Sequence, residues 1–142
     1  MKHQYTQGTL HWLPSWGAVI ANLDMCIACN QYRDFGFGGF VARDVLHKDY
    51  KQANVLCKEL GEGTTLHTYI SLSSASNGSG RHTDDENVWC LQAIGQTLFR
   101  VWENSQKHEY VLSAGDMLYI PSKLEHEAIP LSARVLLSYG SE

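Results

Sequence analysis

From residue 66 onward, the sequence alternates short runs of β-branched and aromatic residues with turn-forming residues. Such runs are typical of β-strands, and their close spacing favours a sandwich or barrel over a parallel sheet with crossover helices. The sequence therefore predicts a mainly all-β fold. The expected strands are 67–72, 88–94, 97–102, 109–112, 117–120 and 133–139.

The first 65 residues carry weaker signals. Residues 49–60 place apolar side chains at helical spacing and end at Gly61, which predicts a helix that packs on the outside of a larger body. Residues 35–41 look like a strand in which glycines allow a close neighbour. Residues 18–29 are compatible with either a helix or a strand.

The length of 142 residues suits one domain, so we expect residues 1–142 to form a single unit. A net charge of −4 gives no reason to expect a nucleic-acid partner. No apolar run is long enough for a membrane span, and the N-terminus lacks the apolar core of a signal peptide. We therefore expect a cytoplasmic protein with no membrane contact, either a monomer or a homodimer.

Four cysteines do not form a zinc-ribbon pattern, because Cys26 and Cys29 are close together whereas Cys57 and Cys90 lie far away. The simplest interpretation is that they are small apolar side chains in a reducing compartment. A redox or metal pair at Cys26 and Cys29 stays open.

The strongest chemical signal is His82-Thr83-Asp84, together with His126. Two residues that lie two apart on a strand point to the same face, so His82 and Asp84 can both enter a barrel. His126 follows an apolar run that stops at Pro121, which predicts a position at the start of a strand. Each of the seven histidines taken alone is more simply a surface residue. As a set, two histidines and one carboxylate can hold one face of a divalent iron.

These residues resemble the cupin pattern. Gly115, Pro121 and His126 fall on its second half, and Gly95 falls on the end of the first. Asp84 stands where many cupins have a second histidine, and Val88 stands where they have a glutamate ligand. By this resemblance, four metal ligands have become three, one of them a carboxylate.

A set of two histidines and one carboxylate resembles the metal ligands of the iron and 2-oxoglutarate oxygenases. Within that class, the stretches 82–102 and 115–128 resemble the JmjC and ribosomal-oxygenase branch. The resemblance covers roughly residues 66–140. It implies a cupin-type double-stranded β-helix (jelly roll) with one or two short flanking helices. It also implies Fe(II) as the metal and 2-oxoglutarate as a co-substrate that is decarboxylated to succinate. The hydroxylated substrate would be a protein side chain or a small molecule.

The same resemblance bears on how the co-substrate is held. Tyr69 is similar to a tyrosine that contacts 2-oxoglutarate, although it could equally be a barrel tyrosine packed in the core. Where the branch has a cation two residues after the glycine of Gln-x-x-Gly, this chain has Thr97, which cannot neutralise a carboxylate. Other oxygenase branches place an arginine on the strand after the distal histidine.

We therefore expect Arg134 to pair with the distal carboxylate, assisted by Ser138 on the same strand face and by Thr97. The alternative is that Arg134 is a surface charge on an edge strand. Arg100 has the opposite strand parity to Thr97 and should point outward.

Three functional hypotheses remain open. The first is an Fe(II)- and 2-oxoglutarate-dependent hydroxylase. The second is a metal-binding cupin that uses no 2-oxo acid, such as a dioxygenase, isomerase or lyase, and Thr97 keeps it open. The third is a non-catalytic cupin module that binds a ligand or a partner chain. The three-ligand set counts against the third, because structural divalent sites usually close with four ligands.

Overall fold

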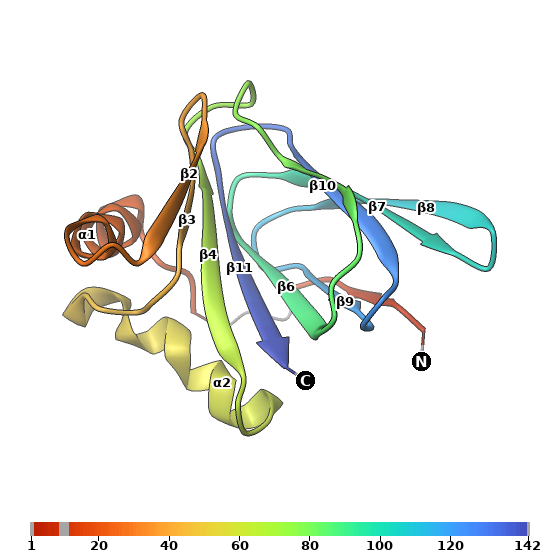
Figure 1. Ribbon diagram of the computed structural model, residues 1–142, viewed down its shortest axis with the longest axis horizontal. Coiled ribbons are helices and arrows are strands. Elements are labelled where there is room, and N and C mark those ends of the chain that lie inside the picture. The colour runs from red at the N-terminus through yellow and green to blue at the C-terminus, as the bar shows by residue number, and fades with distance from the viewer. Residues whose placement is uncertain (1, 9–11, 142) are drawn as a thin grey trace.

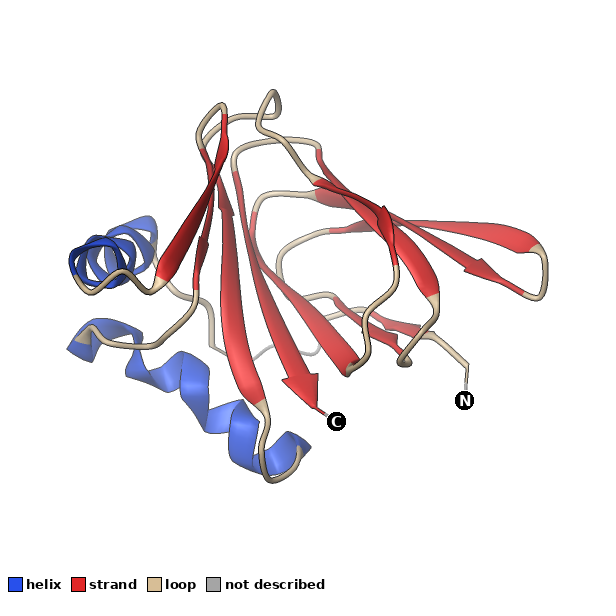
Figure 2. Cartoon of the chain, viewed as in Figure 1, coloured by secondary structure: helices blue, strands red, loops and turns tan. Residues whose placement is uncertain are grey.

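The computed structural model describes residues 2–8 and 12–141, and within them two antiparallel sheets face each other (Figures 1 and 2). The larger sheet runs in the order β1 (Gln4–Thr6), β9 (Met117–Ile120), β6 (Asn87–Ile94), β11 (Arg134–Ser141), β4 (Thr65–Ser71), β3 (Gly39–Ala42) and β2 (Tyr32–Gly36). The smaller runs in the order β5 (Ser79–His82), β10 (Glu125–Pro130), β7 (Thr97–Glu103) and β8 (Gln106–Leu112). The predicted all-β architecture is confirmed.

Short helices cover the outer face of the larger sheet beside β2, β3 and β4 (Figure 2). Helix α1 (Trp16–Ala28) begins where the hydroxyl of Ser15 accepts a hydrogen bond from the Ala18 amide, which satisfies one free donor of the first turn. The predicted helix over 49–60 is present as a 3-10 helix η1 (Lys48–Asn54) that continues into α2 (Val55–Leu60). None of the described helices has the length and hydropathy needed to span a bilayer.

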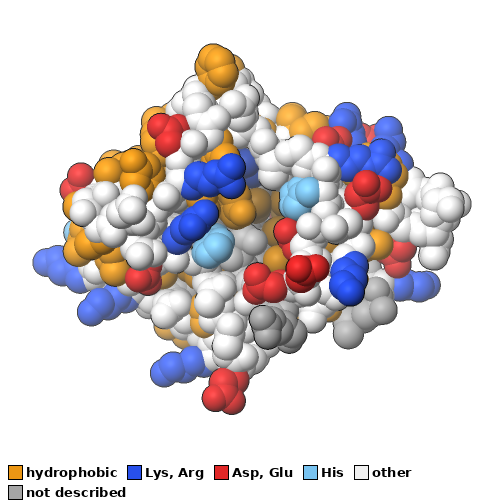
Figure 3. Space-filling model, in the orientation of Figure 1, with side chains coloured by type: hydrophobic (Ala, Val, Ile, Leu, Met, Phe, Trp, Pro, Cys, Tyr) orange, Lys and Arg blue, Asp and Glu red, His pale blue; other side chains and the backbone are white. Residues whose placement is uncertain are grey.

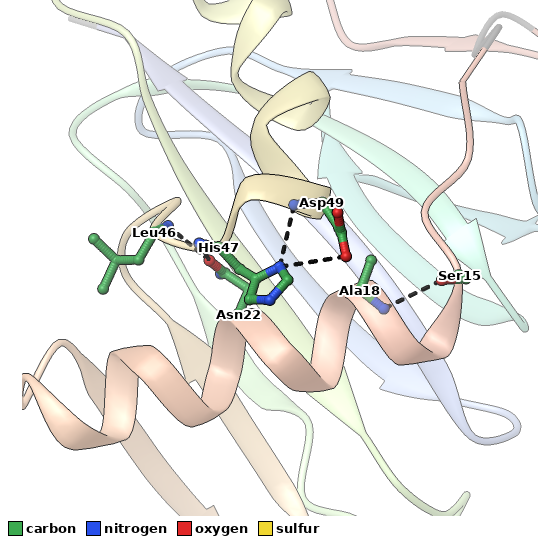
Figure 4. Close-up of polar contacts among 6 residues, drawn as sticks. All are labelled: Ser15, Ala18, Asn22, Leu46, His47 and Asp49. Atoms are coloured by element: carbon green, nitrogen blue, oxygen red, sulfur yellow. Dashed lines mark hydrogen bonds and ion pairs between the residues drawn. The ribbon is translucent and has the colours of Figure 1, made fainter.

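A buried amide fixes α1 to the segment that precedes η1 (Figure 4). The side-chain oxygen of Asn22 accepts hydrogen bonds from the amides of Leu46 and His47 at 2.7 and 3.0 Å. Its amide nitrogen donates to the carbonyl of Asp44 at 2.9 Å. Because every polar atom of Asn22 is satisfied, its burial is tolerated and the upstream segment has one fixed path across the sheet.

The predicted single strand over 35–41 is wrong, because the chain folds there into the hairpin β2–β3. Gly36 pairs with Gly39, so Phe37 and Gly38 form a two-residue turn, and both have positive φ. That geometry is the type I′ turn, whose twist matches the twist of the flanking strands. Gly38 adopts the positive φ of this turn at little cost, because glycine has no Cβ. Phe37, at the tip of the turn, is 78% exposed.

The alternation of side chains along β11 separates two cores. Val135, Leu137 and Tyr139 belong to the core beneath the helices. Leu136 belongs to the core between the two sheets, and Arg134 and Ser138 line a pocket on that same inner face. Alternate side chains of the neighbouring strands β4 and β6 also point into one core or the other. These three central strands therefore pack against the helices on one face and line the interior of the barrel on the other.

The four cysteines are free: Cys26 and Cys90 are buried, Cys57 is half-buried and Cys29 is exposed at the end of α1. The simple apolar interpretation suits Cys26, where burial raises the pKa of the thiol. It does not suit Cys29.

Gly95, in the turn between β6 and β7, should be among the positions most sensitive to a methyl group. Its φ is +72°, and a Cβ there would lie 2.1 Å from the carbonyl oxygen of Ala133. We expect Gly95→Ala to lower the free energy of unfolding by about 2–4 kcal/mol, measured by urea denaturation. The control is Gly80→Ala, where a Cβ meets nothing within 4 Å. Equal stabilities of the two variants would contradict the geometry.

Candidate functional site

Three side chains that could ligate a metal meet at one end of the smaller sheet. His82 on β5 and His126 on β10 are directly paired across the two strands, and their ring centroids lie 4.3 Å apart. The carboxylate of Asp84 lies 3.5 Å from Nε2 of His82 and 3.2 Å from Nε2 of His126. One ligand atom from each residue lies within 4.8 Å of the others, which is compact enough to hold one ion. The structure therefore brings together the three residues that the sequence singles out.

Asp84 reaches this point by a different route from the predicted one. Strand β5 ends at His82, so Asp84 lies in the following loop and strand alternation does not orient it. The amide of Lys123 donates a hydrogen bond to the Asp84 carbonyl at 2.6 Å and holds the loop against the segment before β10. A hydrogen bond with His126 lowers the pKa of the Asp84 carboxyl, although partial burial opposes the shift.

Backbone carbonyls orient both imidazole rings. Nδ1 of His82 lies 2.6 Å from the carbonyl oxygen of Gly80, and Nδ1 of His126 lies 2.9 Å from that of Leu124. A carbonyl oxygen can only accept, so each Nδ1 must carry the proton and donate it. Both Nε2 atoms are thereby directed toward Asp84, in the arrangement that outer hydrogen bonds give to metal-binding histidines.

The three residues border a pocket between the sheets, which we call the inner pocket. It has a volume of about 400 Å³ with its open mouth included. On the face seen in Figure 3, the molecule is hollowed at its centre, with a histidine on either side of the hollow. The inner pocket is lined by Tyr69, Ser79, His82, Asp84, Val88, Cys90, Phe99, His126, Ala128, Arg134, Leu136 and Ser138. Val88, at the position of the cupin glutamate, contributes an apolar wall instead of a ligand.

Arg134 is a buried cation in the wall of the inner pocket. Only 3% of its surface is exposed, and its strand β11 lies between β4 and β6, which contradicts the alternative of a surface charge on an edge strand. Nε donates to the hydroxyl of Ser71 at 3.0 Å, and Nη1 donates to that of Thr97 at 3.1 Å. Burial lowers the pKa of Arg134 to about 10, so it stays charged at neutral pH. Within the described residues, no carboxylate pairs with this charge.

The other expected co-substrate residues take different places around Arg134. Thr97 is fully buried behind the guanidinium and orients it without lining the pocket. Ser138 lines the pocket beside Cys90, its partner across the β11–β6 ladder. Tyr69 also lines the pocket, and burial raises its pKa, so its hydroxyl is protonated and can donate. Arg100 points outward and pairs with Glu109 and Glu127.

Sequence reasoning missed Ser71 and the pocket-lining Cys90. Ser71 lies two residues after Tyr69 on β4 and pairs with Arg134 across the ladder, so strand parity from Tyr69 could have found it. Cys90 lies two residues after Val88 on β6, and the same rule places it in the pocket.

The loop that leads into β5 is fastened to the β2–β3 hairpin. The hydroxyl of Ser76 donates to the carbonyl of Phe37 at 2.8 Å, and the side-chain amide of Asn77 donates to that of Phe35, also at 2.8 Å. Gly78 packs so closely on β10 that a Cβ would lie 2.3 Å from the carbonyl oxygen of Ala128. The loop of residues 72–78 is therefore held against both the hairpin and β10, just before the strand that carries His82.

Comparison with protein families identifies one match. Residues 103–142 match the model of the JmjC domain, a segment that contains His126 and Arg134 but not His82 or Asp84. No match was found among curated proteins.

Solved structures match over most of the chain. YcfD, a ribosomal oxygenase from Escherichia coli in complex with cobalt and succinic acid, is 25% identical with a TM-score of 0.61 over 72% of this chain and 31% of that one. Its complex with cobalt and 2-oxoglutarate gives 23% identity and a TM-score of 0.63 over 77% and 34%. An RmlC-like cupin from Shewanella frigidimarina is 15% identical with a TM-score of 0.56 over 78% and 81%.

The present chain thus spans about a third of the length of YcfD. The RmlC-like cupin, by contrast, is matched over most of its own length, which supports the jelly-roll fold. With the JmjC match over residues 103–142, the resemblance found in the sequence is confirmed at the level of a JmjC-type cupin: the chain has the cupin fold, and its C-terminal strands match a JmjC domain.

Proposed function

We propose that this protein is an Fe(II)- and 2-oxoglutarate-dependent oxygenase that hydroxylates a protein side chain or a small molecule. The observation that carries the proposal is the placement of two features in one pocket. Three side chains that could ligate a metal line the inner pocket, together with a buried arginine that has no carboxylate partner among the described residues. A dicarboxylate with a keto group beside one carboxylate satisfies both, because one end can chelate a metal while the other pairs with a cation.

The residues present fit a divalent iron. His82 and His126 would offer Nε2 lone pairs and Asp84 a carboxylate, which is the ligand set that leaves several coordination positions open. Nε2 of His126 and the Asp84 carboxylate lie 3.2 Å apart, and a bound ion would lie between them. When bound, iron would supply the oxygen chemistry that couples loss of carbon dioxide from the 2-oxo acid to hydroxylation of a C–H bond.

Arg134 would replace the cation that the JmjC branch carries at the position of Thr97. Leaving a guanidinium unpaired in the interior is costly, and a carboxylate in the pocket would offset that cost. Ser71 and Thr97 fix the plane of the guanidinium from two different sheets, so the donor geometry is set before the co-substrate arrives. Tyr69 would donate a further hydrogen bond from β4.

The rest of the pocket wall would control water. Val88, Phe99 and Leu136 are buried apolar side chains beside the polar groups. A drier pocket strengthens the attraction between Arg134 and a carboxylate, because the local dielectric constant falls. The apolar wall at Val88 also keeps a fourth protein ligand away from the ion.

The metal assignment predicts that His82→Ala lowers the affinity for Co(II) or Fe(II) by more than about 100-fold, because a partly exposed site with two remaining ligands holds such ions weakly. Equilibrium dialysis followed by metal analysis would measure this. His108→Ala is the matched control, since His108 lies on β8, where its ring packs against His3. Unchanged metal stoichiometry in His82→Ala would remove the assignment.

The co-substrate assignment predicts a weak visible charge-transfer band when 2-oxoglutarate is added anaerobically to the iron-loaded protein. Air should then release succinate slowly even without a substrate to hydroxylate. Normal iron binding without the band would contradict 2-oxoglutarate use and favour a cupin that needs no 2-oxo acid.

Arg134→Gln should raise the concentration of 2-oxoglutarate that half-saturates this band by about 30-fold or more, because the buried charge pair is lost. Arg100→Gln is the control, since Arg100 is partly exposed and pairs with Glu109 and Glu127. Retained Co(II) binding would establish that the Arg134 variant is folded. Equal half-saturation in both variants would exclude Arg134 as the carboxylate partner.

A further inference from the structure

A second pocket opens beside Asp84, toward the opposite end of β4 from the one that holds Arg134. This side pocket has a volume of about 390 Å³ with its mouth included. It shares Asp84 and three neighbouring residues with the inner pocket, and it adds Thr65, His67, Glu86 and Gly140. A molecule in the side pocket would therefore lie next to the proposed ion without occupying the space beside Arg134.

The carboxylate of Glu86 forms one wall of the side pocket. It lies against Gly140 of β11, where a Cβ would come within 2.7 Å of a carboxylate oxygen, so the glycine leaves room for it. Among residues 2–8 and 12–141, no group forms a hydrogen bond or an ion pair with this carboxylate. A partly buried carboxylate without a partner favours a ligand that brings a positive charge with N–H donors.

His67 and Arg43 lie on the other side of the side pocket from Glu86. Arg43 directly follows β3, two residues after Val41, which pairs with Tyr69. The same register places Arg43 beside His67 on the inner face of the larger sheet. Burial lowers the pKa of His67, and so does the positive charge of Arg43, so the imidazole is largely neutral at neutral pH.

The mouth of the side pocket thus carries opposite charges on its two sides. On the face seen in Figure 3, Lys or Arg side chains lie on one side of the hollow beside a histidine, and Asp or Glu side chains lie across it. The side chain of Arg43 is exposed and pairs with no carboxylate of the described part of the chain. Because β3 and β11 are two strands apart, their backbones are separated by about 10 Å, a gap that two side chains and a small ligand with two charged ends can bridge.

We propose that the side pocket binds the molecule to be hydroxylated and that this molecule is a free amino acid. Its ammonium group pairs with Glu86, its carboxylate pairs with Arg43, and its side chain points past Asp84 toward the proposed ion. One atom of O₂ enters a C–H bond of the amino acid and the other enters succinate, while 2-oxoglutarate loses carbon dioxide. The hydroxylation rests on the proposed function, whereas the binding does not.

Size and charge both favour a free amino acid over a residue within a protein. The enclosed part of the side pocket has room for about six water molecules, which suits a small molecule. At an internal residue of a protein, the backbone nitrogen and carbonyl are in amide bonds and carry no charge. A cationic side chain of a protein would satisfy Glu86 but would leave Arg43 without a carboxylate.

Binding can be tested on the metal-free protein with each of the common L-amino acids as the probe. We expect at least one to bind with a Kd of about a millimolar or tighter, measured by shifts of the backbone amide resonances of Thr65, His67 and Gly140. The N-acetyl amide of the same amino acid is the matched ligand, because it keeps the side chain and loses both charges. It should bind at least about tenfold more weakly.

Glu86→Gln and Arg43→Gln should each weaken binding of the amino acid by about threefold or more, as expected for partly exposed ion pairs. Asp85→Asn and Arg100→Gln are the controls and should leave it unchanged. Asp85 is exposed on the same loop as Glu86 and does not line the side pocket, and Arg100 pairs with two glutamates elsewhere.

Three results would overturn the proposal: no binding by any of the amino acids, equal binding of the N-acetyl amide, or losses in the Glu86 and Arg43 variants no larger than in the controls. Equal binding of the N-acetyl amide would instead indicate a residue within a protein as the substrate.

Failure of the oxygenase function would be seen separately. In the iron-loaded protein supplied with 2-oxoglutarate and air, the amino acid that binds should speed the release of succinate. A normal visible band without faster release would overturn its assignment as the substrate. Absence of the band itself would contradict the use of 2-oxoglutarate and leave the binding of the amino acid to the metal-free protein intact.

Discussion

The two-residue repeat of β4, β11 and β6 is the constraint on which the rest of the structure depends. These strands are central to the larger sheet and have a protein layer on each face. A shift of one residue in β11 would move Val135 and Leu137 into the inner pocket and bury Arg134 among apolar side chains beneath the helices. The packing of the helices and the chemistry of the pocket therefore fix the same register, and neither can be altered alone.

The buried guanidinium of Arg134 shows how the fold accommodates a charge that no carboxylate of the described residues neutralises. Ser71 and Thr97 satisfy two donors, yet hydroxyl groups give less stabilisation than a carboxylate would. Part of the desolvation cost of Arg134 is thus left for a ligand to offset. This is a common physical origin of anion affinity: the protein holds a donor set that is better satisfied when occupied than when empty.

Much of the β-sheet region could be predicted from sequence, because strand runs and parity are local properties. Strands β4, β6, β7, β8, β9 and β11, the inward face shared by Arg134 and Ser138 and the outward direction of Arg100 follow from spacing, whereas β1 was not predicted. Asp84 was expected at the site, but the loop that brings it there could not be predicted, since it is held by a hydrogen bond from the amide of Lys123, far along the chain. The β2–β3 turn was hidden for another reason: Phe37 takes positive φ, which is uncommon for a bulky residue, so its neighbours were interpreted as one strand.

The hydrogen bonds from Ser76 and Asn77 to the hairpin join segments 39 and 42 positions apart. They remove conformational freedom from the chain directly upstream of β5, and that freedom would otherwise be lost whenever an ion is captured. The N-terminal part of the chain, which carries no side chain of the His82, Asp84 and His126 cluster, would thus add to the affinity for the proposed ion through entropy. Because this segment is already ordered in the folded protein without an ion, ion binding would cost less conformational entropy.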